Sequence, residues 1–239
     1  MEKSYTIGKN DALIIADVQN DFLLGGSLGV KDGDQIIPVL NEYAKIFKKA
    51  NAKIVASRDW HPLNHMSFKA QGGPWPPHCV QNSEGAKFHP DLKLPEGTAI
   101  VSKATDPAQE AYSVFDGTGL AETLKSQSVT RVFVGGLATD YCVLNSVLDA
   151  RKLGLDAVVL MDAVRGIDVK PGDVDKAVEA MVKSGAEQAI LADFPETPEI
   201  PPEEPEAERT AEKPLTRAEK KKKARLRSRG PYRKARVER

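Results

Sequence analysis

The segment 131–149 constrains the fold most strongly, because it joins a short apolar run to a helical pattern through a glycine pair. Residues 132–134 form the run and Gly135-Gly136 ends it, which predicts a buried strand. After Ala138 the apolar residues recur at helical spacing, as Val143, Leu144, Val147 and Leu148. A strand that passes through a tight turn into a helix is the repeating unit of an α/β fold.

Cys142 lies in the first turn of that predicted helix. The unpaired backbone N–H groups and the dipole at a helix start favour an anion, so we expect the pKa of this thiol to be lowered. Cys142 is therefore a candidate nucleophile. The alternative is a buried structural cysteine, which is the common state of an isolated cysteine.

Similar apolar runs and helical patterns alternate along the rest of the chain. The predicted strands are 12–16, 53–57, 99–102, 131–135, 156–161 and 188–192. The predicted helices are 34–50, with Asp34 as the N-cap, 119–127, 138–153 and 173–184. Short buried strands that alternate with helices predict an α/β protein of three layers, α/β/α, with a central, mostly parallel six-stranded sheet.

Four chemically versatile side chains follow predicted strands, namely Asp17, Asp59, Lys103 and Cys142. The carboxyl ends of parallel strands meet at one edge of a sheet, where ligands bind near the topological switch point. The four residues are therefore expected to converge on a single site.

Asp17 and Lys103 both suit a reaction that starts from a thiol. A carboxylate at a dry strand end has a raised pKa and can accept the proton of Cys142. A nearby ammonium lowers the pKa of the thiol and stabilises an oxyanion. The alternatives are that Asp17 caps backbone amides and that Lys103 is a solvated surface residue.

The long irregular segment 58–98 contains six prolines and all four histidines of the chain, of which His61, His65 and His78 lie within twenty residues together with Asp59. Loops of this length in a compact domain are usually functional. With Asp59, these histidines offer the carboxylate and imidazole ligands that suit Zn, Fe or Mn. The alternative is that the histidines are structural.

Taken together, these motifs closely resemble those of the nicotinamidases (pyrazinamidase-type amidohydrolases) of the isochorismatase-like hydrolase superfamily. The matching stretches are Asp17-Val-Gln-Asn-Asp-Phe22, Asp59-Trp-His-Pro-Leu-Asn-His65, Trp75-Pro-Pro-His-Cys79, Lys103 and Gly136-Leu-Ala-Thr-Asp-Tyr-Cys142. The resemblance covers about residues 10–194, in consistent order.

The resemblance implies a cysteine amidohydrolase that converts nicotinamide to nicotinate and ammonia through a thioester, in NAD salvage. It assigns Asp17, Lys103 and Cys142 as the catalytic triad. It assigns Asp59, His61 and His78 as ligands of one divalent metal, with His65 as a fourth or outer ligand. It also implies that Phe22 and Trp75 flank the pyridine ring and that the backbone N–H groups of Ala138 and Cys142 bind the oxyanion, after a cis Leu137–Ala138 peptide bond. Tyr112 is expected in the pocket wall, on a segment that departs from the family pattern.

The C-terminal region differs in composition from the rest of the chain. Residues 195–208 hold six Glu and no Lys or Arg, and residues 209–239 hold fourteen Lys or Arg against three Glu. We therefore expect one hydrolase domain over residues 1–194 and a disordered acidic, Pro-rich linker and basic tail over 195–239. The tail contacts nucleic acid or another anionic surface, or it only aids solubility, or its basic stretch folds against the net negative body of the chain.

The sequence also indicates the cellular compartment of the protein. Met1-Glu-Lys-Ser-Tyr5 precedes no apolar signal segment, no run of eighteen apolar residues occurs, and the two cysteines make no disulfide framework. These features predict a cytoplasmic protein, and a homo-oligomer is left open. The alternative functions are another small-amide hydrolase of the superfamily, or a hydrolase-derived module whose basic tail binds nucleic acid.

Overall fold

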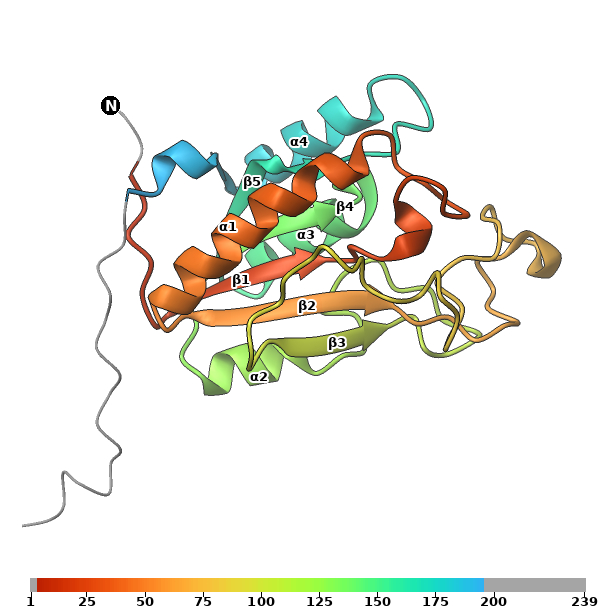
Figure 1. Ribbon diagram of the computed structural model, residues 1–239, viewed down its shortest axis with the longest axis horizontal. Coiled ribbons are helices and arrows are strands. Elements are labelled where there is room, and N and C mark those ends of the chain that lie inside the picture. Colours follow the sequence, from red (N-terminus) through yellow and green to blue (C-terminus); the bar gives the residue numbers. More distant parts are fainter. Residues whose placement is uncertain (1–3, 196–239) are drawn as a thin grey trace, which may run out of the picture. The chain divides into compact units, whose positions relative to one another are not determined.

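A computed structural model describes residues 4–195 and contains a six-stranded, wholly parallel sheet in the order β3-β2-β1-β4-β5-β6 (Figure 1). The strands are β1 (Asp11–Ala16), β2 (Lys53–Asp59), β3 (Ala99–Lys103), β4 (Arg131–Leu137), β5 (Asp156–Arg165) and β6 (Glu187–Ala189). The predicted sheet is confirmed, in both its number of strands and its parallel direction.

The strand order places the topological switch point between β1 and β4. The chain first builds outward from β1 to β2 and β3, and then returns to pair β4 with the other edge of β1. Asp17 follows β1 directly, and Cys142 lies in the turn after β4. The two residues therefore flank the crevice where ligands bind in open parallel sheets.

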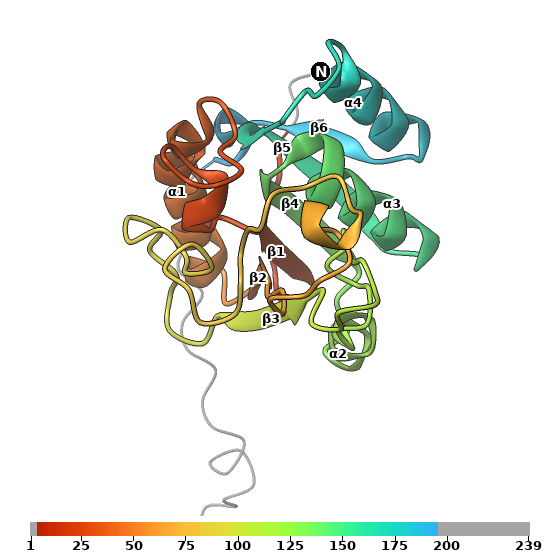
Figure 2. The same cartoon turned by 90° about the vertical axis from the view of Figure 1, so that its right-hand side faces the viewer.

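Helices cover both faces of the sheet, which gives the three predicted layers (Figure 2). The helices are α1 (Ile36–Lys49), α2 (Leu120–Ser126), α3 (Leu144–Lys152) and α4 (Asp173–Lys183). On β1, Leu13 and Ile15 share a core cluster with α1, whereas Ala12 and Ile14 share one with α2, α3 and α4. Successive side chains of a strand point to opposite faces, so every residue of β1 is buried.

Two predicted helix starts were wrong. The helix after β4 does not start as a regular α-helix, because Thr139–Val143 form a π-helical turn before α3 begins. Asp34 does not cap α1, since it lies inside a 3₁₀ turn, Gly33–Gln35, whose last residue precedes the helix. In both places a tighter or wider turn replaces the first turn of the expected helix.

Gly136 allows β4 to approach β1 closely next to the crevice. Its φ is +118°, and a Cβ atom built on it would lie 2.1 Å from the carbonyl oxygen of Ala16. Only glycine is tolerated where both the backbone angle and the space exclude a side chain. The glycine pair of the sequence therefore sets the strand spacing beneath the site.

No helix in the part of the chain that the structure describes is long and apolar enough to cross a membrane. The acidic linker and basic tail, predicted as a separate disordered region, lie outside residues 4–195 apart from Pro195. Their boundary and role therefore stay predictions from the sequence.

Candidate active site

The structure brings Asp17, Lys103 and Cys142 into direct contact. Lys103, the last residue of β3, places its Nζ 3.0 Å from Asp17 Oδ2 and 3.4 Å from Cys142 Sγ. All three residues are buried. The convergence predicted from the strand ends is thus found, although the three residues are separated by 39 or more positions in sequence.

Lys103 is surrounded by acceptors and stays an ammonium. Its Nζ also contacts the carboxylate of Asp59 and donates to the carbonyl oxygen of Ala111 at 3.1 Å. Burial by itself would lower the pKa of Lys103, but the negative charges of Asp17 and Asp59 raise it well above its ordinary value. One cation therefore compensates two buried carboxylates.

Burial dominates the acid–base state of the other two triad members. It raises the pKa of Asp17, against the opposing effect of Lys103, and Ser57 Oγ donates to Asp17 Oδ1 at 2.8 Å. It also raises the pKa of the Cys142 thiol well above its ordinary value, although Lys103 acts in the lowering direction. The expected lowering of the thiol pKa is therefore wrong for this arrangement, because desolvation outweighs the ammonium and the helix start.

The thiol has a proton acceptor within reach. A carboxylate oxygen of Asp17 and the sulfur of Cys142 lie within 4.8 Å of each other, and an Asp17 carboxylate with a raised pKa is a better base than an ordinary one. Cys142 can therefore be a protonated thiol before the reaction, because its proton moves to Asp17 while the sulfur attacks.

The turn that carries Cys142 starts at a cis peptide bond between Leu137 and Ala138, as the resemblance implied. Ala138 adopts an extended conformation and its carbonyl oxygen accepts the N–H groups of Tyr141 and Val143, both at 3.1 Å. Ala138 and Cys142 thus lie on one short, hydrogen-bonded turn at the end of β4.

A second cluster, of candidate metal ligands, adjoins the triad. Asp59, His61 and His78 each offer one ligand atom, these atoms lie within 4.8 Å of one another, and all three residues are buried. His61 Nδ1 lies 3.0 Å from the carbonyl oxygen of His78, and His78 Nδ1 lies 2.8 Å from that of Pro76. Because a carbonyl oxygen is the partner of Nδ1 in both histidines, Nε2 of each remains available to bind a metal ion. This is the usual orientation of metal-binding histidines.

The protonation state of His61 also suits a metal ligand. Burial and the neighbouring His78 lower the pKa of His61 to about 3. An imidazole binds a cation in its neutral form. Asp59 and the two histidines therefore fit a divalent ion by donor type, proximity and charge state.

His65 occupies a neighbouring but different position. Its Nδ1 lies 2.7 Å from Ser67 Oγ and its Nε2 lies 3.0 Å from the carbonyl oxygen of Gln109. Its ring centroid is 4.3 Å from that of His61. Both ring nitrogens are thus engaged, so of the two roles implied for His65 the arrangement favours that of an outer residue that supports His61.

The three aromatic residues expected around a substrate lie near the two clusters. Trp75 Nε1 donates to the hydroxyl of Tyr112 at 3.1 Å, so these two rings are held together. Phe22 lies beside His78, with ring centroids 5.5 Å apart. Tyr141, which was not among the residues expected at the site, packs edge-on against Trp75 at 5.2 Å.

Gln19 is a buried site residue that the sequence patterns did not single out. Its side-chain amide accepts the backbone N–H of Asp59 and donates to the carbonyl oxygens of Asp59 and Ala86, all at 2.8–2.9 Å. It therefore fixes the main chain at the end of β2. Its place in the Asp17–Phe22 motif was the available signal, but its partners are backbone groups that no spacing pattern encodes.

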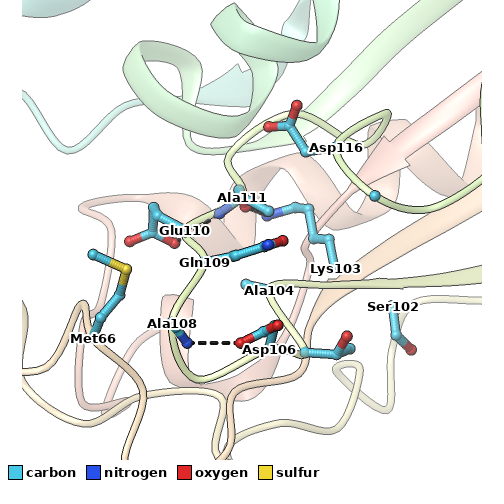
Figure 3. Close-up of a pocket in the computed structure, with 12 residues that line it drawn as sticks. Met66, Ser102, Lys103, Ala104, Asp106, Ala108, Gln109, Glu110, Ala111 and Asp116 are labelled. Carbon is cyan, nitrogen blue, oxygen red and sulfur yellow. Dashed lines mark hydrogen bonds between the residues drawn. The ribbon is translucent and has the colours of Figure 1, made fainter.

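A pocket of about 590 Å³ opens beside Lys103 (Figure 3). Its wall is formed mainly by the segment after β3, including Asp106, Gln109, Glu110 and Asp116. This is the segment that departs from the family pattern, and it places a pocket with three acidic side chains next to the buried lysine.

Comparison with known proteins agrees with this geometry. A family model described as the isochorismatase domain matches residues 11–193. The nicotinamidase of Escherichia coli K12 is 39% identical over 207 residues, which cover 78% of this chain and 97% of the relative.

Solved structures show the same relationship. A pyrazinamidase of Pyrococcus horikoshii in complex with zinc has 51% identity and a TM-score of 0.73, covering 76% of this chain and 99% of that one. An L. infantum protein in complex with nicotinate has 37% identity and a TM-score of 0.75, covering 80% and 98%. The fold and the Asp–Lys–Cys site define an isochorismatase-like hydrolase. This chain belongs to the isochorismatase family, in the branch that contains the nicotinamidases.

Proposed function

We propose that this protein hydrolyses nicotinamide to nicotinate and ammonia, as an enzyme of NAD salvage. The observation that carries the proposal is the contact of Lys103 Nζ with both Asp17 and Cys142 beside the Asp59, His61 and His78 cluster. Relatives with 36–51% identity that are named as nicotinamidases or pyrazinamidases support the choice of a pyridine or pyrazine carboxamide as substrate.

The first half-reaction forms a thioester. Asp17 accepts the thiol proton while Cys142 Sγ forms a bond to the carboxamide carbon, and the C=O electron pair moves to the oxygen. The backbone N–H groups of Ala138 and Cys142 donate to that oxyanion, and Lys103 adds positive charge nearby. The C–N bond then breaks as Asp17 returns the proton to the amide nitrogen, so that ammonia leaves.

The second half-reaction uses water and restores the enzyme. Asp17, again a carboxylate, takes a proton from a water molecule that attacks the thioester carbon. The C–S bond breaks, the sulfur of Cys142 regains the proton, and nicotinic acid is released and ionises to nicotinate. The raised pKa of Asp17 suits both directions of transfer, because the residue must donate as well as accept.

Asp59, His61 and His78 would hold the divalent metal. A bound cation supplies Lewis acidity and positive charge that orient the polar ring of the substrate. Zinc, iron and manganese all suit two imidazoles and a carboxylate, and the zinc complex of the Pyrococcus relative favours zinc. Phe22 and Trp75 would flank the substrate ring, with Tyr112 holding Trp75 through its hydroxyl.

The test is ammonia release from nicotinamide by the purified protein, with and without a chelator, beside Cys142→Ala. We expect activity in the metal-replete wild type, a chelator-sensitive loss that added metal reverses, and a residual rate in Cys142→Ala below roughly one thousandth. The variant should keep its melting temperature, because a buried thiol is replaced by a small apolar group. Substantial turnover by folded Cys142→Ala would refute the assignment.

The main competing activity is hydrolysis of another small amide by the same triad. The Asp59, His61 and His78 cluster favours a substrate with a ring nitrogen over a simple aliphatic amide. Parallel assays with pyrazinamide, benzamide and an N-carbamoyl amino acid would separate these classes. An inactive wild type toward nicotinamide that turns over a different amide would establish the alternative.

A further inference from the structure

Glu110 lies at the edge of the candidate metal cluster. One ligand atom each of His61, His65 and Glu110 lies within 4.8 Å of the others. This is the same His61 that groups with Asp59 and His78. The carboxylate of Glu110 is therefore next to a ligand of the cation, although it comes from a loop 49 residues further along the chain.

The loop that carries Glu110 is tied to the histidine segment. The backbone N–H of Met66 donates to the carbonyl oxygen of Pro107 at 2.9 Å, and His65 Nε2 lies 3.0 Å from the carbonyl oxygen of Gln109. Both contacts hold the segment that leads into Glu110. The position of its carboxylate beside the histidines is thus fixed by the fold.

The side chain of Glu110 is half-buried between the histidines and the pocket. In Figure 3, Glu110 and Met66 lie on one side of the pocket, and Lys103 and Asp116 on the other. Glu110 Oε1 accepts the backbone N–H of Ala111 at 3.0 Å. A carboxylate has further acceptor capacity, so this bond leaves Glu110 able to face a cation.

Without Glu110, the candidate metal site has little negative charge. The candidate ligands are Asp59 and two imidazoles, which bring no negative charge, and the carboxylate of Asp59 also pairs with Lys103. A divalent cation there would meet little uncompensated negative charge. His65 cannot correct this, because an imidazole brings no negative charge and both of its ring nitrogens already have partners.

We infer that Glu110 is the second carboxylate of the cation site and increases its affinity for a divalent metal. The inference rests on the metal-assisted function proposed above and adds a residue to it. Partners beyond the direct ligands commonly change metal affinity by roughly 10- to 100-fold. Glu110 is expected to do the same by its charge, while Asp59, His61 and His78 provide the direct ligands.

The test measures metal affinity itself, by competition of the full-length protein with a chromophoric chelator for Zn²⁺ and by metal content after dialysis. Glu110→Gln removes the charge and keeps an oxygen for the N–H of Ala111. Asp106→Asn is the matched control, since Asp106 lines the same pocket and its Oδ1 likewise accepts a backbone N–H, that of Ala108. His61→Ala reports on the site as a whole.

We expect Glu110→Gln to weaken Zn²⁺ binding about 10-fold or more, and Asp106→Asn to stay within about twofold of wild type. Equal affinities of Glu110→Gln and wild type, with a clear loss in His61→Ala, would overturn the role of Glu110 alone. Unchanged Zn²⁺ binding in His61→Ala, or no Zn²⁺ binding by the wild type, would instead contradict the proposed metal site, and the role of Glu110 would be refuted with it. Equal losses in Glu110→Gln and Asp106→Asn would also overturn it, because the effect would then be the general charge of the pocket.

Discussion

At the scale of single residues, the site depends on one buried cation. Lys103 is fully buried and neutralises part of the charge of Asp17 and Asp59, while it also contacts the sulfur of Cys142. The same ammonium therefore has a structural role, as the partner of two carboxylates, and in the proposed mechanism it also supplies positive charge beside the reacting atoms. Buried charges of this kind are tolerated only when they are paired.

Replacement of Lys103 should consequently damage both folding and catalysis. In Lys103→Met, Asp17 and Asp59 would face each other without a cation, and we expect a loss of roughly 3–5 kcal/mol in the free energy of unfolding. Activity should fall by at least about 100-fold, as on removal of one donor to an oxyanion. Urea denaturation and ammonia release measure the two effects.

A control separates this loss from the removal of any lysine. Lys152 is exposed and pairs with Asp149 on the surface of α3, and Lys152→Met should leave both quantities nearly unchanged. If Lys103→Met were as stable as Lys152→Met, the pairing argument would fail, because the carboxylates would then have another means of compensation.

At the scale of elements, the close approach of β1 and β4 sets the crevice. Asp17 and the Cys142 turn come from these two strands, and Gly136 is the residue that lets them meet. A side chain at this position would press on Ala16, the residue directly before Asp17. The geometry of the triad is thus linked to the absence of one Cβ atom.

Gly136→Ala should be strongly destabilising for this reason. We expect a loss of at least about 3 kcal/mol, from a strained backbone angle together with overpacking against Ala16. Gly154→Ala is the matched control, because Gly154 also has a positive φ, +81°, but a Cβ atom added to it would meet nothing within 4 Å. Its cost should be about 1–2 kcal/mol, from the backbone alone. Similar melting temperatures for the two variants would contradict the packing argument.

Most of the strands and helices were predictable, because a buried parallel strand has the sequence of an apolar run between turn residues. The convergence of Asp17, Asp59, Lys103 and Cys142 followed from the direction of those strands. The features of the site that could not be predicted depend on the desolvation of side chains or on the course of irregular loops. The raised pKa of the thiol of Cys142 follows from burial, and the position of Glu110 follows from backbone hydrogen bonds of an irregular segment.

At the scale of the whole molecule, the proposed catalytic and metal-binding residues all lie in one part of the chain. The family match ends at residue 193, and every proposed site residue lies between Asp17 and Cys142. Phe194 still belongs to the core, since its ring stacks on Tyr5 at 5.3 Å and packs edge-on against Tyr43 at 5.1 Å. A boundary after Pro195 therefore keeps the hydrophobic core whole.

Removal of residues 196–239 should leave nicotinamide hydrolysis within about twofold of the full chain, because no proposed site residue and no described core residue is lost. An unchanged melting temperature would accompany this result. A larger loss of activity at unchanged stability would mean that the tail contributes to the site, and the proposed division of the chain would be wrong.

The charge of the tail makes a separate prediction about nucleic acid. Fourteen Lys or Arg in residues 209–239 favour binding to phosphate groups, but the same stretch holds only one aromatic residue, Tyr232. Binding by charge alone weakens steeply with salt. We expect the full chain to retard a short RNA at low ionic strength and to release it near 0.15 M salt, where charges are screened beyond roughly 8 Å. The chain cut after Pro195 should show no retardation under either condition. Retardation by the full chain that persists at 0.15 M salt and is lost on truncation would instead mean that the tail is a specific nucleic-acid-binding segment.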